Sequence, residues 1–300
     1  MFIIRHKFIF ISISIVLVIS AIVTLIVFGL PFGTDFRGGS LLNGTYETAR
    51  PDVATITEAI KADMDIEATV TPVEEKGITV KTLALTETEH QALLKSLALN
   101  GETFTESSFN SIGPSVGEEL KRKSIVSIVL VSLGIVFFIA YAFRKVSRPI
   151  SSWKYGLIAI GTLLHDVLIP VGIFSILAHF KGFEVDTLFV VGVLTILGLS
   201  VSDTIVVFDR IRENLRKNNE TKNNMSFAET VGTSISQTFT RSINTSLTVI
   251  IALLALVFFG PQSTQNFALM LTAGMFFGTY SSIFLASPLL VVWAEKSEKK

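Results

Sequence analysis

Three ionisable residues lie inside apolar stretches of this sequence, where they could do chemistry. Asp203 lies late in the run LFVVGVLTILGLSVSDTIVVF, and His165 and Asp166 lie within GTLLHDVLIPVG. A carboxylate costs about 2.5–3.5 kcal/mol at the centre of a membrane-spanning helix, so these groups are expected to face protein or water. Ionisable residues in such places indicate a functional site, here one that could take up and release a proton.

A partner for Asp203 is predicted in the stretch QTFTRSINTSLTVIIALL. The polar residues that recur there at helical spacing, and so share one face, are Gln237, Arg241, Asn244, Thr245 and Thr248. We expect this stripe to face a bundle interior or a wet cavity, with Arg241 paired to Asp203. The alternative is that Arg241 extends to the membrane surface as an anchor and that Asp203 only joins two helices.

His165 and Asp166 could together relay protons. Because neighbours in sequence point about 100° apart on a helix, one of the two is expected to support the other. Pro170 cannot donate a helical hydrogen bond to the Asp166 carbonyl. Local hydrogen bonding at a kink is therefore an alternative to the relay.

The elements that must position these groups are long apolar helices. Of the 300 residues, 49% are hydrophobic and 17% charged, whereas soluble domains are about a quarter charged. Runs of about 20 apolar residues are long enough to cross a bilayer. We predict a polytopic α-helical membrane protein with six spans, near 8–28, 125–143, 154–178, 187–208, 243–260 and 266–293. The first is too long for a signal-peptide core and is read as an uncleaved span.

The orientation of the spans follows from Lys and Arg in the short loops. They gather before residue 8, between 143 and 154, between 208 and 243, and after 293, whereas the opposite loops, 179–186 and 260–265, contain only Lys181. Both termini are therefore predicted to be cytoplasmic. The predicted parts are 1–28 (N-terminus and first span), 29–123 (a domain outside the cytoplasm), 124–293 (the remaining spans, with a cytoplasmic loop 209–241) and 294–300 (a cytoplasmic tail).

The segment 29–123 has the pattern of a small α+β domain. Strands are predicted at 40–47, 66–73, 77–85 and 102–113, and helices at 51–62 and 86–98. Thr86 followed by Glu89 predicts a capping box at the start of the second helix. The order β-α-β-β-α-β is that of the ferredoxin-like arrangement.

Glycine-containing segments connect this domain to the spans. The motif GTDFRGG contains Gly33, Gly38 and Gly39, which suggest tight backbone, and Asp35, which could fix a hinge with Arg37. At the other junction, IGPSVGEELKRKS, Gly113 and Pro114 end the last strand and a helix then runs into the second span. In the last span, Gly274, Gly278 and Ser282 form a small-residue face suited to helix packing.

Several classes of function find no support in the sequence. The chain has no cysteine, and its net charge is zero, so nothing indicates nucleic acid binding. It lacks HExxH, GxSxG and Walker A motifs, and no metal or cofactor site is predicted. We therefore expect no enzymatic activity, and any work must draw on an ion gradient or a partner.

Five stretches together resemble one family of membrane proteins. GTDFRGG, IGPSVGEELKRKS, HDVLIPVG, SVSDTIVVFDRIRENLR and RSINTSLT, in this order and over nearly the whole chain, are similar to the SecF family of the bacterial Sec protein-export machinery, which resembles half of the RND transporter architecture. The resemblance implies a location in the bacterial cell membrane. It also implies that Asp203 and Arg241 take the places of a fourth-span aspartate and a fifth-span arginine implicated in proton movement.

The same resemblance implies partners and a function. The expected partners are SecD, the SecYEG channel, a translocating polypeptide and membrane lipids. The expected function is coupling of the proton-motive force to late protein translocation together with SecD.

Three other functions remain open at this stage. The chain could be a scaffold that binds emerging polypeptide, in which case Asp203→Asn keeps activity and Gly278→Leu abolishes it. A small-molecule exporter of the RND type needs twelve spans, and this chain has half of them. An intramembrane hydrolase would need a nucleophile beside His165 and Asp166, and no recognisable motif supplies one.

Overall fold

The computed structural model describes residues 2–98, 103–142 and 152–298. The chain divides into two compact units, one made of Met1–Pro31 with Ser127–Lys300 and the other of Phe32–Val126. The basic residues predicted between the second and third spans, Arg144, Lys145 and Arg148, lie outside the described residues.

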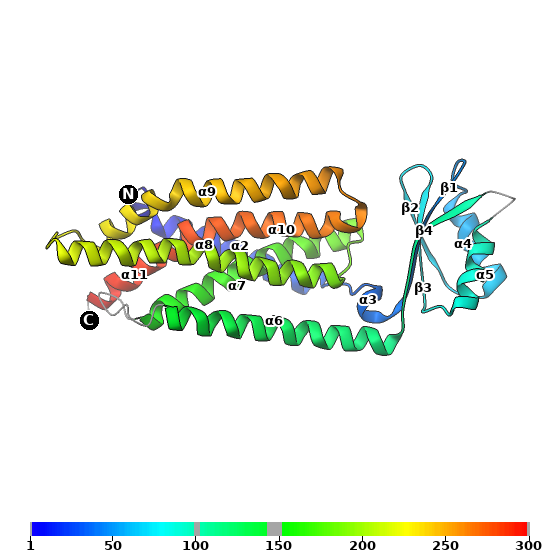
Figure 1. Ribbon diagram of the computed structural model, residues 1–300, viewed down its shortest axis with the longest axis horizontal. Coiled ribbons are helices and arrows are strands. Elements are labelled where there is room, and N and C mark those ends of the chain that lie inside the picture. The colour runs from blue at the N-terminus through cyan, green and yellow to red at the C-terminus, as the bar shows by residue number, and fades with distance from the viewer. Residues whose placement is uncertain (1, 99–102, 143–151, 299–300) are drawn as a thin grey trace. The chain divides into compact units, whose positions relative to one another are not determined.

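Six helices of the described chain are long and apolar enough to cross a membrane, as predicted. They follow a short α1 (Phe2–Arg5) and are labelled in Figure 1: α2 (Lys7–Phe28), α6 (Pro114–Ala142), α7 (Ser152–Lys181), α8 (Thr187–Glu220), α9 (Phe227–Phe259) and α10 (Gln262–Ser281), the last continuing through the π-helix η2 (Ser282–Ala286) into α11 (Ser287–Glu298). Mid-helix π-turns are rare and often lie at functional sites.

The charged segment predicted as a loop at 209–241 is mostly helical. Helix α8 continues to Glu220 and α9 begins at Phe227, so only 221–226 connects them. Its charges are compatible with a helix because they pair one turn apart, as Arg212 Nη2 does with Asp209 Oδ1 at 2.7 Å. Side-chain bonds join the two helices along this extension, among them Asn214 Nδ2 to Ser234 Oγ at 2.8 Å.

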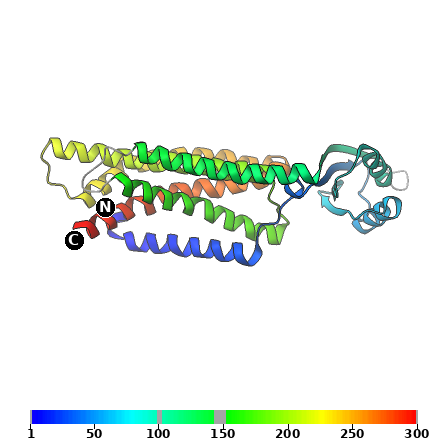
Figure 2. The same cartoon turned by 90° about the horizontal axis from the view of Figure 1, so that it is seen from below.

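Helix α7 packs against α2, α8 and α10 at the centre of the membrane unit, and Figure 2 shows the same helices from a second side. Glycines permit the closest approaches. A Cβ at Gly172 of α7 would lie 2.6 Å from the Ala21 Cβ of α2, and one at Gly274 of α10 would lie 2.3 Å from the Ile196 Cγ1 of α8. The small-residue face predicted in the last span is thus confirmed as a packing face toward α8.

The second unit contains a four-stranded antiparallel sheet with two helices. Its elements are β1 (Gly39–Tyr46), α4 (Val53–Met64), β2 (Thr69–Val73), β3 (Gly77–Thr82), α5 (Glu87–Leu97) and β4 (Phe104–Ile112), preceded by the short α3 (Thr34–Arg37). The strands are ordered β2-β3-β1-β4. Alternate residues of β1 and β3 pack with α4 and α5 in a core that includes Leu42, Ile56, Ile78 and Leu93. The element order predicted from the sequence is the order observed.

Local capping signals set the helix starts in this unit. Thr86 and Glu89 form the predicted capping box, with the Thr86 backbone N–H donating to Glu89 Oε2 at 2.7 Å. Hydrogen bonds from the backbone and hydroxyl of Thr86 hold the pKa of the Glu89 carboxyl below its usual value. The short helix α3, by contrast, is too brief to leave a periodic signal in the sequence.

The close approach of α8 and α10 predicts unequal effects of two identical substitutions. Gly274→Ala should lower the free energy of unfolding by about 1–3 kcal/mol, because its methyl group overlaps Ile196. Gly161→Ala, on an exposed face of α7 with open space around it, should be tolerated. Equilibrium unfolding in detergent measures both, and equal effects would contradict the packing described.

Candidate functional site

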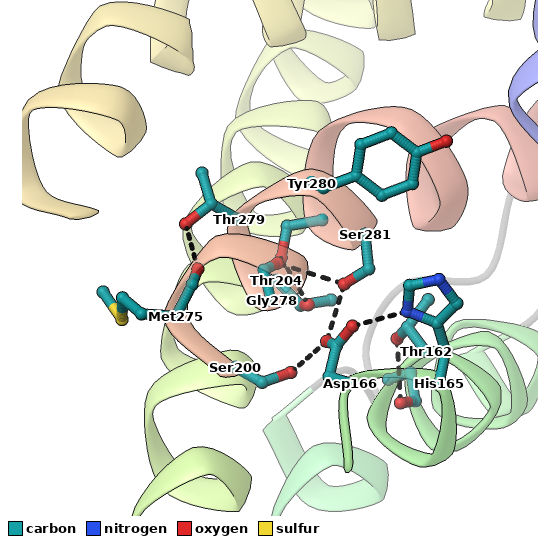
Figure 3. A network of polar contacts seen from close by, with 12 residues as sticks. Thr162, His165, Asp166, Ser200, Thr204, Met275, Gly278, Thr279, Tyr280 and Ser281 are labelled. Atoms are coloured by element: carbon teal, nitrogen blue, oxygen red, sulfur yellow. Dashed lines mark hydrogen bonds and ion pairs between the residues drawn. The ribbon is translucent and has the colours of Figure 1, made fainter. Parts of the chain in front are cut away.

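Asp166 is a buried carboxylate held by three helices. It lies on α7, with no exposed surface. Its Oδ2 accepts hydrogen bonds from Ser200 Oγ of α8 at 2.5 Å and from Ser281 Oγ of α10 at 2.6 Å. Figure 3 shows the three side chains converging between these helices. Because hydrocarbon offers no hydrogen bonds, such hydroxyls substitute for water around the carboxylate.

His165 completes this centre from the same turn of α7. Its Nδ1 lies 2.7 Å from Asp166 Oδ1, and its side chain is 2% exposed. The imidazole stacks near the Tyr280 ring of α10, at a centroid separation of 6.2 Å (Figure 3). The predicted kink residue, Pro170, lies inside α7 one turn further on. The side chains of His165 and Asp166 contact each other directly, although neighbouring positions on a helix point about 100° apart.

Asp203 forms a second centre, on the part of α8 that contacts α9 and α10. Its Oδ2 accepts from Thr279 Oγ1 of α10 at 3.2 Å and from Ser246 Oγ of α9 at 3.4 Å. The same two hydroxyls are hydrogen-bonded to each other. Unlike Asp166, Asp203 is partly exposed on the surface of this chain.

The two centres share one crossing of helices α8 and α10. Ser200 contacts Asp166 while Asp203 is one turn away on α8; on α10, Thr279 binds Asp203 and Ser281 binds Asp166. The π-helix η2 begins directly after Ser281. Asp166 and Asp203 therefore both accept hydrogen bonds at the same close contact between α8 and α10.

The predicted polar stripe on α9 faces outward in this chain, which corrects the expectation of an inward face. Arg241, Asn244, Thr245 and Thr248 are exposed. Among the described residues, no ion pair joins Arg241 to Asp203, whose side-chain partners are hydroxyls. This face was expected to point inward because a polar stripe on an otherwise apolar helix is costly to expose to lipid.

The buried face of α9 carries small hydroxyl side chains instead. Thr230, Ser234, Thr238, Ser242 and Ser246 recur every four residues and are all buried. Small side chains permit close helix packing, so size rather than polarity selects the inner face. Ser246 of this row, together with Ser200, Thr279 and Ser281, contacts the carboxylates, a role that sequence reasoning missed. The spacing by four on α9 is the signal that could have indicated Ser246.

The predicted hinge residues form a tight connection within the second unit. Gly38 and Gly39 have φ of +77° and +143°, and a Cβ at Gly38 would lie 2.8 Å from Pro114 Cα. Gly33 and Asp35 belong to the turn of α3 that precedes them. Gly113 accepts from the Gly117 N–H as α6 begins at Pro114. The two glycine-containing segments therefore pack against each other, an arrangement that favours a rigid connection over a free hinge.

The chain was compared with known families, proteins and structures. A family model described as protein export membrane protein SecD/SecF, C-terminal, matches residues 92–296. The protein translocase subunit SecF of Thermobaculum terrenum is 42% identical over 98% of this chain and 94% of its own length. The protein translocase subunit SecDF of Bacillus subtilis is 33% identical over 99% of this chain, which is 38% of that protein.

A solved structure agrees with these matches. The crystal structure of SecDF from Thermus thermophilus, described as a translocon-associated membrane protein, is 31% identical and has a TM-score of 0.78. The match covers 97% of this chain and 38% of that one. The chain is thus similar to a nearly complete SecF and to part of a longer SecDF.

The hydroxyl contacts of Asp166 predict a measurable stability cost. Ser281→Ala should lower the free energy of unfolding by about 1–2 kcal/mol, because it removes one donor from a buried carboxylate. Ser236→Ala is the matched control, since that exposed hydroxyl bonds only within its own helix, to the Gly232 carbonyl. Chemical unfolding in detergent compares the two variants. If the Ser281→Ala protein were as stable as the control, the hydrogen bond from Ser281 to Asp166 would not contribute to stability.

The glycine connection predicts different responses at two glycines. Gly38→Ala should destabilise the second unit by about 1–3 kcal/mol, since the backbone there has positive φ and no room for a Cβ. Gly113→Ala should be tolerated, because nothing lies within 4 Å of the added atom. Hydrogen exchange of the β1 and β4 amides reports the difference. If these amides were equally protected from exchange in both variants, glycine would not be required at position 38.

Proposed function

Because the chain belongs to the SecD/SecF family of protein-export membrane proteins, we propose that it couples the proton-motive force to late protein translocation, together with SecD. Membership of this family places it in the membrane as a subunit of the bacterial protein translocase. In the relatives named SecDF, the part that matches this chain makes up 38% of a longer polypeptide. This supports association of the present chain with SecD. The proposed role requires no covalent chemistry, cofactor or metal.

The observation that carries the proposal is the environment of Asp203. This carboxylate lies in a membrane-spanning helix and is partly exposed on this chain; its hydrogen-bond partners among the described residues are hydroxyls of α9 and α10. Hydroxyls can satisfy both the charged and the neutral form of a carboxyl group, because each can donate or accept a hydrogen bond. A site held in this way can take up and release a proton without losing its contacts.

The exposed polar stripe of α9 supports an interface with SecD. Arg241, Asn244, Thr245 and Thr248 would be costly to expose to lipid tails, whereas a partner helix can satisfy them. We propose that SecD covers this face and that assembly brings Arg241 into electrostatic reach of Asp203. The pair predicted from the sequence would then exist in the complex and not in the single chain.

The proposed cycle uses the charge of Asp203 as the switch. A proton entering from the outer side neutralises the carboxylate, weakens its attraction to Arg241 and shifts α8 against its neighbours; release to the cytoplasm restores the pair. One charge moved through 100 mV yields about 2.3 kcal/mol. That energy biases a two-state equilibrium by roughly fifty-fold.

We propose that the second unit lies outside the cytoplasm and moves when the charge of Asp203 changes. The positive-inside pattern supports cytoplasmic termini and an outer position for Phe32–Val126. Its strand order and element order support a ferredoxin-like fold. We propose that it contacts polypeptide leaving SecYEG. Because the glycine-containing segments pack tightly, it would move as a rigid body.

The proposal is tested by neutralising Asp203 in the assembled complex. Asp203→Asn, co-reconstituted with SecD and SecYEG, should reduce the gradient-dependent part of export about tenfold or more, because the variant cannot cycle its charge. Asp209→Asn is the control, since Asp209 is exposed on the same helix and pairs with Arg212. Export is measured with and without an uncoupler. Full gradient dependence in Asp203→Asn would rule out this mechanism.

The scaffold alternative predicts the reverse. Under it, Asp203→Asn retains gradient-dependent export and Gly278→Leu abolishes export by disrupting the contact of α10 with Ser200. The same reconstitution therefore separates the two functions.

A further inference from the structure

The His165–Asp166 pair is a buried polar centre that the cycle at Asp203 does not use. Ser200 and Ser281 donate to its carboxylate, and Nδ1 of His165 lies 2.7 Å from Asp166 Oδ1. With Asp166 ionised and His165 neutral, the pair carries one negative charge, enclosed between α7, α8 and α10.

An ionised Asp166 also fixes the histidine tautomer. Because a carboxylate oxygen can only accept, the Nδ1 facing Asp166 Oδ1 then carries the hydrogen. Nε2 then has a free lone pair, and this atom is buried without a hydrogen-bond partner among the described residues. Unsatisfied buried polar atoms are uncommon in native proteins and call for an explanation. An unpaired base beside an enclosed negative charge is suited to receive a cation.

The cation that fits is a proton. The donors of Ser200, Ser281 and His165 reach the carboxylate directly, at 2.5–2.7 Å, which leaves no position between them for a metal ion. In addition, the described chain holds no group of three His, Cys, Asp or Glu side chains able to bind a metal.

We propose that the His165–Asp166 pair is a second proton-binding site, with Nε2 of His165 as the accepting atom. The Nε2 lone pair forms an N–H bond with a proton delivered by water, the imidazole becomes an imidazolium, and Asp166 retains the compensating charge. The net charge of the pair changes from −1 to 0, which reduces the cost of enclosing it. The role of this step in export rests on the proposed function; the binding itself does not.

The groups around the pair favour a single added proton. Two titratable groups face it, Asp203 from α8 and Tyr280 from α10. Helix α2 contributes the buried Ser14, whose hydroxyl lies beside Tyr280. Lys7, the charged residue of α2, is paired with Glu295 of α11. The charge of Lys7 is thus engaged elsewhere, and the negative charge of Asp203 attracts a proton to His165.

The two proton sites are predicted to influence each other through the α8–α10 crossing. Thr279 and Ser281, two residues apart on α10, bind Asp203 and Asp166 respectively. Thr204 of α8 and Ser282 of η2 are hydrogen-bonded at 2.9 Å beside them. A shift of this contact alters the donors of both carboxylates. Coupling between two sites is reciprocal, so loading at either changes the affinity of the other.

Nitrogen NMR of the full chain in lipid nanodiscs tests the proposal. The chain has four histidines, so ¹⁵N-histidine labelling with His165→Asn identifies the relevant signal, and His179→Asn, exposed on the same helix, is the control. We expect a neutral Nδ1–H tautomer that converts to imidazolium on acidification between about pH 9 and pH 5. In Asp166→Asn, conversion should need a proton concentration at least about tenfold higher, because the negative charge that compensates the imidazolium is gone.

Asp203→Asn tests the coupling in the same experiment. It should raise the proton concentration needed to load His165 about two- to fivefold, since a nearby negative charge is removed. A Nε2–H tautomer, or one protonation state throughout the range, would overturn the site. An unchanged titration in Asp203→Asn would overturn the coupling.

Two further arms keep the outcome interpretable. If His165→Asn fails to fold, replacing His6, His90 and His179 one at a time assigns the remaining signal to His165. Failure of the export test at Asp203 leaves the NMR result unaffected, because that measurement reads the His165 nitrogen directly. The two proposals can therefore fail separately.

Discussion

A carboxylate inside a membrane must be satisfied by groups of the protein itself, and this constraint determines how the central helices pack. Hydrocarbon supplies no hydrogen bonds, so the partners of Asp166 and Asp203 must come from neighbouring helices. Hydroxyl donors are short, and they reach only if the helices are close. The glycines at 274 and 278 make that distance possible where α10 meets α8. The hydrogen bonds of the buried carboxylates therefore require the helices of this bundle to pack closely.

The same requirement explains why both carboxylate centres lie at the contact of α8 with α10. Both carboxylates accept from hydroxyls of one turn of α10, Thr279 and Ser281, and the helix changes to a π-turn directly afterwards. A π-turn has wider hydrogen-bond spacing than an α-helix and can be gained or lost at modest cost. The crossing thereby combines rigid contacts with a neighbouring segment able to absorb a small displacement. This combination suits a site whose charge changes during a cycle.

The sequence predicted the ionisable centres but not their surroundings. Asp203 and the His165–Asp166 pair stand out because charge is rare in apolar runs, and the six spans follow from the length of those runs. Serine and threonine are common in membrane helices, so Ser200, Ser246, Thr279 and Ser281 carry no comparable signal. The outward orientation of Arg241 could not be obtained from one chain either, because the polar face of a helix can point to a partner as well as to its own bundle. In the second unit, alternation and capping residues predicted the element order, whereas the four-residue α3 was missed because it is too short to show periodicity.

The outward polar face of α9 bears on how the protein is produced in the cell. If SecD covers this face as proposed, a copy synthesised alone would present Arg241, Asn244, Thr245 and Thr248 to lipid, where such polar side chains are costly. Matched synthesis of the two polypeptides, or their translation as one continuous chain, limits the lifetime of that state. Gene fusion in this family can therefore be understood as a solution to subunit stoichiometry.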